Sequence, residues 1–325
     1  MVPAISAARA VLRLYPGPLH CSALFLIAFA CMGCSVGSSS AEVDADHFAF
    51  DLLPVRHDLV AAGMVHSCAL DRTGTTSCWG IDTQGSTAPP DVQLTTVSSG
   101  LMHTCGLDLE GRPHCWGANT SGQTDLVDDV YVDIAAGGAH TCALNSDGRA
   151  TCWGSDDEGQ SSPPDDPLES IAAGGAHTCA LDSDGHAICW GSDDHGQSEA
   201  PDRSFDEISA GSTHSCALDT DGQALCWGND VHGQSSAPAG NFQQICAGTA
   251  HTCAISDTGR GVCWGSNAHG RSSPPPRDFV SISTGGAHTC GVDHNGNLLC
   301  WDPDIHPWTK PNIDTNARPR TDTFP

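Results

Sequence analysis

One histidine and two cysteines recur together along this chain, at a spacing that suits either a metal ion or a disulfide. In one copy they are His140, Cys142 and Cys152, and the group recurs at steps of 37 residues. Zinc sites usually combine short paired ligand spacings with a fourth ligand, and no fourth ligand recurs here. We therefore weigh a disulfide against a metal site and a reduced, packed pair, and we favour the disulfide.

The group occurs seven times without insertion or deletion, and a fixed period of this kind decides the fold before any secondary structure does. The cysteine pairs are Cys68 and Cys78, Cys105 and Cys115, Cys142 and Cys152, Cys179 and Cys189, Cys216 and Cys226, Cys253 and Cys263, and Cys290 and Cys300. The histidines are His66, His103, His140, His177, His214, His251 and His288. A tryptophan follows each second cysteine, at Trp79, Trp116, Trp153, Trp190, Trp227, Trp264 and Trp301.

Each copy is predicted to contain a β-hairpin, because Asp147-Gly148 is a turn signal between two short apolar runs. A three-residue loop would put Gly148 in the left-handed region and pair Asn145 with Arg149. The two cysteines then face each other at a non-hydrogen-bonded position, where Cα atoms lie about 4.5 Å apart, within the range of a disulfide. A two-residue loop would instead set the first cysteine opposite the tryptophan.

A third short strand precedes each hairpin, at 60–63, 134–137, 171–174 and 208–211, and a connection rich in Pro and Ser follows it, as at 159–164. Such units either stack as an open array, which needs atypical capping repeats, or close as a ring. The end copies resemble the middle ones, and seven units lie within the usual range for propellers. We predict an all-β, seven-bladed β-propeller over residues 55–301, with about three short strands in each 37-residue repeat.

The repeated pattern A-A-G-x-x-H-T-C-A-L-x-x-D-G-x-x-x-C-W-G-x-x-x-x-G-Q resembles the regulator-of-chromosome-condensation repeat. Its short period is similar to the compact bacterial form found in propeller-type β-lactamase inhibitors. The resemblance covers about Val60 to Trp301. It implies a propeller fold, but a shared fold does not fix an activity.

The N-terminal residues 1–33 are typical of a signal peptide, with Arg9 and Arg13 before an apolar run too short to span a bilayer comfortably. Gly33-Cys34 fits a bacterial lipobox, although Cys31 stands where such motifs usually have Leu. We expect Cys34 to be lipidated and 34–54 to be a tether, with plain secretion as the alternative. The Pro-rich residues 302–325 are predicted to be an irregular tail.

The exported part is strongly acidic: 11 basic and 39 acidic residues remain beyond residue 33, giving 11 − 39 = −28. This charge argues against nucleic acid or anionic lipid as a partner. Cys246 replaces an Ala of other copies, and we expect an inert thiol there. No cofactor and no metal site are predicted.

The repeated His and Trp are interpreted as structural, since one slot is filled the same way seven times. The His is expected to bond to backbone at the start of a strand, and the Trp to lie between blades with its N–H on a carbonyl. A less regular group follows each hairpin and is expected to form an acidic rim: Asp156, Asp157, Glu158, Asp193, Asp194, His195, Asp230, His232 and His269. The rim is either solvated, a cation site without the calcium-loop spacing, or a contact for a partner.

No catalytic motif is present, and the loops differ little between copies. We therefore favour a monomeric binding or scaffold protein that is lipid-anchored to the bacterial envelope and recognises another protein. The alternatives are an inhibitor of a secreted or periplasmic enzyme, for which the expected Tyr, Trp or Arg anchors are lacking in the rim, and a glycan-binding or glycan-active propeller. Guanine-nucleotide exchange is the least favoured, because its partner is intracellular.

Overall fold

The computed structural model describes residues 60–125 and 127–301. The chain divides after Leu53, and all described residues belong to the second part, Pro54–Pro325. The predicted signal peptide, the tether with Cys34 and the tail from 302 to 325 lie outside the described residues. Within the described ranges, no helix has the length and apolar character needed to cross a membrane.

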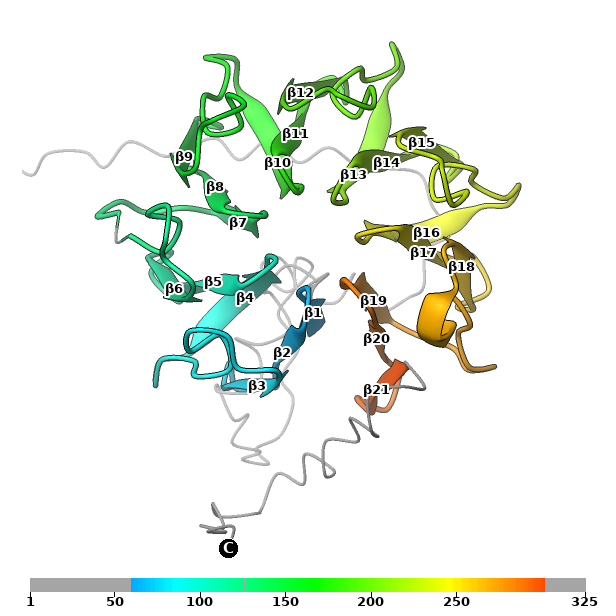
Figure 1. The fold of residues 1–325 in the computed structure, drawn as a ribbon, viewed down its shortest axis with the longest axis horizontal. Coiled ribbons are helices and arrows are strands. Elements are labelled where there is room, and N and C mark those ends of the chain that lie inside the picture. The colour runs from blue at the N-terminus through cyan, green and yellow to red at the C-terminus, as the bar shows by residue number, and fades with distance from the viewer. Residues whose placement is uncertain (1–59, 126, 302–325) are drawn as a thin grey trace, which may run out of the picture. The chain divides into compact units, whose positions relative to one another are not determined.

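Seven three-stranded antiparallel sheets are arranged around a ring, so the predicted seven-bladed propeller is confirmed (Figure 1). Each sheet consists of three consecutive strands, and blade 1 is formed by β1 to β3 and blade 7 by β19 to β21. The innermost strands of the seven blades are β1 (Val60–Ala62), β4 (Leu94–Ser99), β7 (Asp133–Ala136), β10 (Leu168–Ala173), β13 (Phe205–Ala210), β16 (Phe242–Ala247) and β19 (Ser281–Thr284).

A middle and an outer strand complete each blade as a hairpin. The middle strands are β2 (His66–Leu70), β5 (His103–Asp108), β8 (His140–Leu144), β11 (His177–Asp182), β14 (His214–Asp219), β17 (His251–Ser256) and β20 (Thr289–Val292). The outer strands are β3 (Thr76–Gly80), β6 (Pro113–Gly117), β9 (Ala150–Gly154), β12 (Ala187–Gly191), β15 (Ala224–Gly228), β18 (Gly261–Gly265) and β21 (Leu298–Trp301). One short 3-10 turn, Ala268–Gly270, lies among them.

The hairpin register agrees with the sequence prediction. The Asn145 amide donates to the Arg149 carbonyl, Gly148 has a φ of 78°, and Cys142 faces Cys152. Disulfides join all seven cysteine pairs, with Cα atoms 4.0–4.1 Å apart. The metal and reduced-pair alternatives for these cysteines are therefore wrong.

The hydrophobic core lies between blades rather than within one. Leu144 of blade 3 packs with Leu168, Ile171 and Ala180 of blade 4, and Trp190 covers the same cluster. A single three-stranded sheet has no second layer against which to bury its apolar side chains. Each blade therefore uses its neighbour as that layer, in agreement with the expectation that one unit cannot fold alone.

The ring closes through contacts that repeat the other blade junctions. At the last junction the Gly286 amide donates to the Gly63 carbonyl, and the Ala62 amide donates to the Ser283 hydroxyl. The first of these bonds completes a ring of seven equivalent hydrogen bonds. In each, the amide of the second residue after an inner strand donates to a backbone carbonyl of the next blade. The other six run from Met64 to Leu101, Leu101 to Gly137, Gly138 to Gly174, Gly175 to Gly211, Ser212 to Gly248 and Thr249 to Gly285.

These bonds draw the inner ends of the blades into a narrow opening, which we call the neck. Its seven turns are Gly63-Met64, Gly100-Leu101, Gly137-Gly138, Gly174-Gly175, Gly211-Ser212, Gly248-Thr249 and Gly285-Gly286. The first residue is always glycine because a side chain there would strike the next blade: a Cβ on Gly63 would lie 2.6 Å from the Gly100 carbonyl oxygen. The small residues predicted near a crowded axis are therefore required by contact with backbone.

Each disulfide is expected to contribute separately to stability. Replacing Cys142 and Cys152 together by Ala should lower the free energy of unfolding by about 2.5 to 3 kcal/mol, because the unfolded chain loses an 11-residue closed loop. Denaturant titration without reductant measures this change. Cys246→Ala is the control, because Cys246 forms no disulfide, and its effect should stay below about 1 kcal/mol. Equal midpoints for the double variant and the natural protein would contradict the prediction.

Candidate functional site

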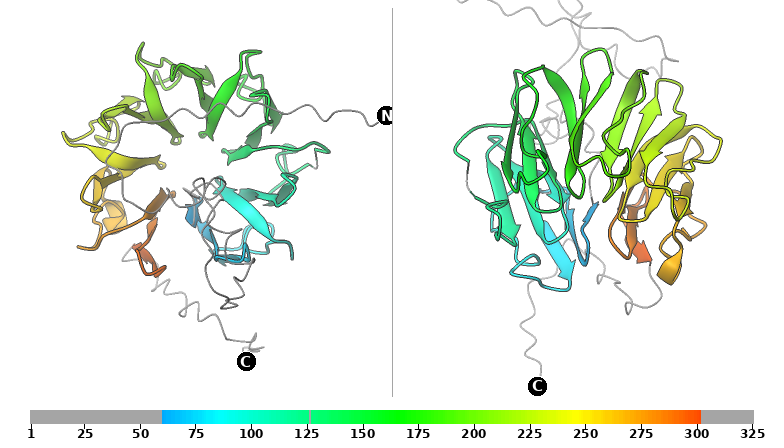
Figure 2. Two further views of the ribbon diagram at one scale, coloured as in Figure 1. Left: turned by 180° about the vertical axis from the view of Figure 1, so that it is seen from behind. Right: turned by 45° about the horizontal axis from the view of Figure 1, so that its top comes forward.

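The ring has two faces that differ in the segments they present. The neck face carries the neck turns and the six-residue rim loops that follow the outer strands, at 81–86, 118–123, 155–160, 192–197, 229–234 and 266–271. The amide of the first rim-loop residue donates to the residue after the neck turn, as from Ser155 to Ala139 and from Ile81 to Val65. The opposite face, here the hairpin face, carries the hairpin turns and the starts of the inner strands. There the Leu168 amide donates to the Gly148 carbonyl. Figure 2 shows the ring from behind and in a tilted view.

The seven repeated histidines are buried and join neighbouring blades. The Nε2 atom of His140 lies 2.9 Å from the hydroxyl of Thr178 in the next blade. The same bond recurs six times, between His66 and Thr104, His103 and Thr141, His177 and Ser215, His214 and Thr252, His251 and Thr289, and His288 and Ser67. The expected backbone partner was wrong. The partner is a hydroxyl of the next blade, from the Thr or Ser that directly follows the repeated His of that blade. Only the geometry of adjacent blades reveals this partner.

The hydroxyl fixes which histidine nitrogen carries the proton. Thr178 donates its hydrogen to the Gln160 carbonyl at 3.0 Å, so its oxygen accepts from the Nε2–H of His140. The indole N–H of Trp190 donates to the same carbonyl at 3.0 Å. One carbonyl of the preceding rim loop therefore holds both the hydroxyl and the tryptophan of the next blade. The predicted Trp-to-carbonyl bond is confirmed.

Burial keeps these histidines neutral. It is the largest cause that lowers their pKa from 6.5 to about 4 for His66, His140 and His214, and to about 3 for His103, His177 and His251. Each is fully or almost fully shielded from solvent. The role of these histidines is therefore structural, as the repeat predicted, because their hydrogen bonds hold neighbouring blades together.

Three of the nine predicted rim residues serve to shape the rim loops. Asp156, Asp193 and Asp230 each accept the amide five residues later, at 2.8 Å, and so close the loop. The buried Gln160 side chain accepts the Glu158 amide and donates to the Ser155 hydroxyl. The loop conformation is therefore set by internal hydrogen bonds.

The other rim side chains point to solvent from these fixed loops. Asp157, Glu158 and Asp194 are exposed, as are the histidines of blades 4 to 6, His195, His232 and His269. The rim residues all lie on the neck face but on different blades, and no cluster of three or more potential metal ligands occurs within 60–125 and 127–301. The rim is thus an acidic surface and not a compact pocket.

Basic residues are distributed in the opposite way. Six described arginines lie on the hairpin face, in hairpin turns or just before inner strands: Arg72, Arg112, Arg149, Arg203, Arg260 and Arg277. Among the described rim loops, Arg271 is the one arginine, and its guanidinium donates to the Gly286 carbonyl and to Ser266. The rim loops carry seven carboxylates, Asp82, Asp156, Asp157, Glu158, Asp193, Asp194 and Asp230. The neck face is therefore strongly negative.

The inner strands surround a central cavity of about 810 Å³. Asp206, Asp221 and Asp257 line it, as does Asp133, whose pKa is raised by burial. Cys246 lines it too, half-buried, with its thiol donating to the Cys253 carbonyl at 3.4 Å. Cys246 therefore occupies a partly buried position at the wall of this cavity.

Comparison with known proteins agrees with this architecture. Residues 94–123, 131–160, 169–197, 205–234 and 242–271 match the sequence model of the regulator of chromosome condensation (RCC1) repeat. The five matched segments are those of blades 2 to 6. No curated protein matches the chain.

Solved structures similar to this RCC1-like chain include two plant receptor ectodomains. The ectodomain of the Physcomitrella patens receptor kinase CR4 is 27% identical with a TM-score of 0.67, over 76% of this chain and 74% of that one. The CRINKLY WD40 ectodomain of Arabidopsis thaliana ACR4 is 24% identical with a TM-score of 0.64, over 77% and 98%. Prp20p of Saccharomyces cerevisiae is 19% identical with a TM-score of 0.58, over 70% and 80%. The last two likenesses show the fold alone.

The hydroxyl between blades can be tested at one position. Thr178→Val keeps the shape but leaves the His140 N–H without its partner and removes one of the two hydrogen bonds to the Gln160 carbonyl, and should lower the free energy of unfolding by about 1 to 3 kcal/mol. Thr178→Ser is the matched control, since Ser67 and Ser215 fill the equivalent position. Its loss should be smaller, and denaturant titration would compare the two variants. Equal stability of both would show that the methyl group, not the hydroxyl, matters.

The buried histidines also predict a dependence of stability on pH. Their folded-state pKa values of about 3 to 4 lie below the unfolded value of 6.5. Between these pKa values the unfolded chain binds more protons than the folded chain. The free energy of unfolding is therefore highest above pH 6.5 and falls as the pH drops toward 4. Denaturation midpoints across the window measure the fall, and His177→Gln should make the slope shallower. A constant midpoint would contradict neutral, buried histidines.

Proposed function

We propose that this protein is a binding scaffold of the cell envelope that recognises another protein through its acidic neck face. The observation that carries the proposal is that the rim loops of the neck face carry seven carboxylates and, among the described residues, a single arginine, Arg271. Carboxylates gather on the rim loops, and the described arginines, Arg271 apart, lie on the hairpin face. A surface of one sign attracts and orients a partner of the opposite sign.

Three further features support a binding role outside the cytoplasm. Seven disulfides suit an oxidising compartment, and the N-terminal pattern up to Cys34 suits export with a lipid anchor. Propellers of similar structure bind proteins. Yeast RCC1 has been crystallised with Kap60 bound, and Prp20p is described with its binding properties to Gsp1p and histones. We propose a monomer that is lipid-anchored through Cys34 and has no catalytic role.

The proposal is tested by capture with the full-length protein as bait in envelope extract, followed by affinity measurement on the protein recovered. The rim variant combines Asp157→Asn, Glu158→Gln and Asp194→Asn, which are exposed and do not close their loops. The control combines Asp147→Asn, Asp184→Asn and Asp221→Asn, which remove the same charge from the hairpin face.

A single stoichiometric protein should be recovered, and its affinity should fall about tenfold for the rim variant and with added salt, but not for the control. Recovery of no stoichiometric protein, or equal loss in both variants, would overturn the proposal. Recovery of glycan would favour the carbohydrate-binding alternative. Inhibition of a recovered enzyme would make the scaffold an inhibitor.

A further inference from the structure

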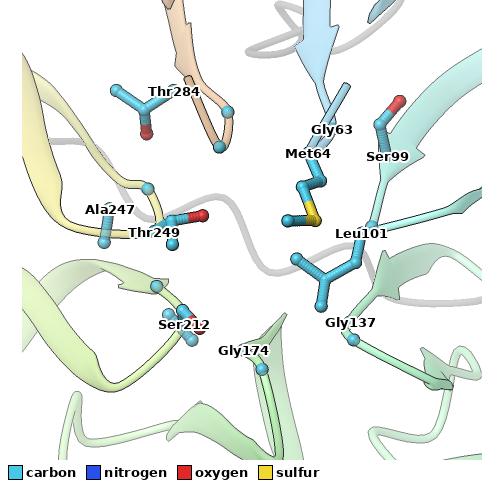
Figure 3. A pocket seen from close by; sticks show the side chains of 18 of the residues that line it. Gly63, Met64, Ser99, Leu101, Gly137, Gly174, Ser212, Ala247, Thr249 and Thr284 are labelled. Atoms are coloured by element: carbon cyan, nitrogen blue, oxygen red, sulfur yellow. The ribbon is translucent and has the colours of Figure 1, made fainter. Parts of the chain in front are cut away.

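The symmetry of the neck face is broken in blades 1 and 2. The second residue of the neck turn is Gly138, Gly175 or Gly286 in three blades and Ser212 or Thr249 in two more, but it is Met64 in blade 1 and Leu101 in blade 2. Figure 3 shows the Met64 and Leu101 side chains projecting into the neck from adjacent blades, opposite turns that contribute little side chain.

Neighbouring positions in the same two blades are also apolar. Met102 follows Leu101, and Val65 follows Met64, where four other blades have Ala139, Ala176, Ala250 and Ala287 and the fifth has Thr213. Ile81 begins the first rim loop, where later loops begin with Ala118, Ser155, Ser192, Asn229 and Ser266. We call Met64, Val65, Ile81, Leu101 and Met102 the apolar sector.

The sector is continuous and open to solvent. The Met64 amide donates to the Leu101 carbonyl, and the Ile81 amide donates to the Val65 carbonyl, so these residues adjoin. Met64 is 38%, Met102 39% and Ile81 57% exposed. Exposed apolar side chains that gather on one face mark interaction sites, and methionine adapts well to a partner's shape.

The ring itself does not need these side chains. Blade 3 forms the same neck turn, the same inter-blade bond and the same rim loop with Gly138, Ala139 and Ser155. A large exposed apolar residue at the equivalent sites therefore adds nothing that closure of the ring requires. Its contribution must lie in what contacts the neck face.

The surrounding charge defines the chemistry of that contact. Asp82 directly follows Ile81, and six more rim carboxylates lie on blades 3 to 5 of the same face. A second copy of this chain would bring like charges together, which disfavours self-association through this face. A segment that carries Lys or Arg would be attracted.

We propose that the apolar sector anchors the partner, by receiving a large apolar side chain of a basic protein segment whose Lys and Arg residues face the rim carboxylates. The neck beside Met64 and Leu101 holds a cavity of about 60 Å³, which can admit the end of such a side chain. This inference rests on the proposed function and names the site and the partner chemistry within it.

The test uses the full-length protein and short fluorescent peptides as probes. One peptide has a single Trp among Lys and Ser, a second has Ser in place of the Trp, and a third has Glu in place of each Lys. The sector variant combines Met64→Gly, Leu101→Gly, Ile81→Ser and Met102→Ala, which are the residues that blade 3 has at these positions. The control combines Leu109→Ser and Val132→Ser, exposed apolar residues of the hairpin face. Near-ultraviolet circular dichroism and thermal unfolding verify that each variant is folded.

Fluorescence anisotropy should show that the Trp–Lys peptide binds about tenfold more tightly than the Ser–Lys peptide. The sector variant should abolish this difference, the control should keep it, and the Glu peptide should not bind. Equal binding of both Lys peptides, an unchanged difference in the sector variant, or no binding at all would overturn the inference. If the rim variant loses binding of the Lys peptides and the sector variant does not, the proposed function stands and the inference about the apolar sector is wrong.

Two other occupants of the sector would be recognised in the same experiment. If the Trp–Lys peptide binds only after the chain is shortened to end at Trp301, the sector is covered by residues 302–325 of this chain and the inference is wrong. If the sector variant converts a dimer into a monomer in light scattering, the occupant is a second copy, and the inference is again wrong.

Discussion

The structure depends on one carbonyl in a rim loop that accepts two hydrogen bonds from the next blade, as in five of the six described rim loops. In blade 4 the Thr178 hydroxyl and the Trp190 indole both donate to the Gln160 carbonyl, and the hydroxyl in turn accepts from His140 of blade 3. His140, Thr178 and Gln160 are buried, so the loss of one partner would leave another polar group unsatisfied in the protein interior, where that is costly. The contacts join residues 18, 30 and 38 positions apart. The same separations recur around the ring, and this accounts for a period that keeps both its residues and its length.

A ring held in this way divides the sequence into residues that repeat and residues that differ. The repeated His, Thr or Ser, Cys, Trp and Gly are used by the blade junctions, the disulfides and the neck. Differences in polarity between blades occur where side chains reach solvent, as at Ile81 against Ser155 or His195 against Glu158. One buried position also varies, between Leu94, Tyr131 and Phe205, but it stays large and apolar or aromatic. Function is therefore carried by departures from the repeat, and the apolar residues of blades 1 and 2 depart furthest in chemistry.

Local interactions were predictable from sequence, whereas contacts between blades were not. The Asp147-Gly148 turn fixes the hairpin register within a few residues, and the Cys142–Cys152 disulfide follows from that register. The acceptor of His140 could not be deduced, because Thr178 lies 38 residues away and meets it only when two blades are side by side. The sequence also did not separate Asp156, which closes its loop, from Asp157, although the bond from the Ser161 amide to Asp156 is local, because only the folded shape of the loop decides which carboxylate reaches that amide. The export signals and Cys34 lie outside the described residues and stay predictions.

The two faces differ in how their carboxylates are paired. On the hairpin face, Arg203, Arg260 and Arg277 pair with Asp219, Asp278 and Asp293, so part of the negative charge there is neutralised. The rim carboxylates have no such partners except backbone amides and hydroxyl groups, which leave their charge in place. Because the loops that carry them are already closed by hydrogen bonds, a partner meets these charges in a fixed arrangement and little ordering is needed on binding. A rigid ring with an acidic neck face thus favours partners whose own positive groups match the spacing of its blades, and this requirement is geometric as well as electrostatic.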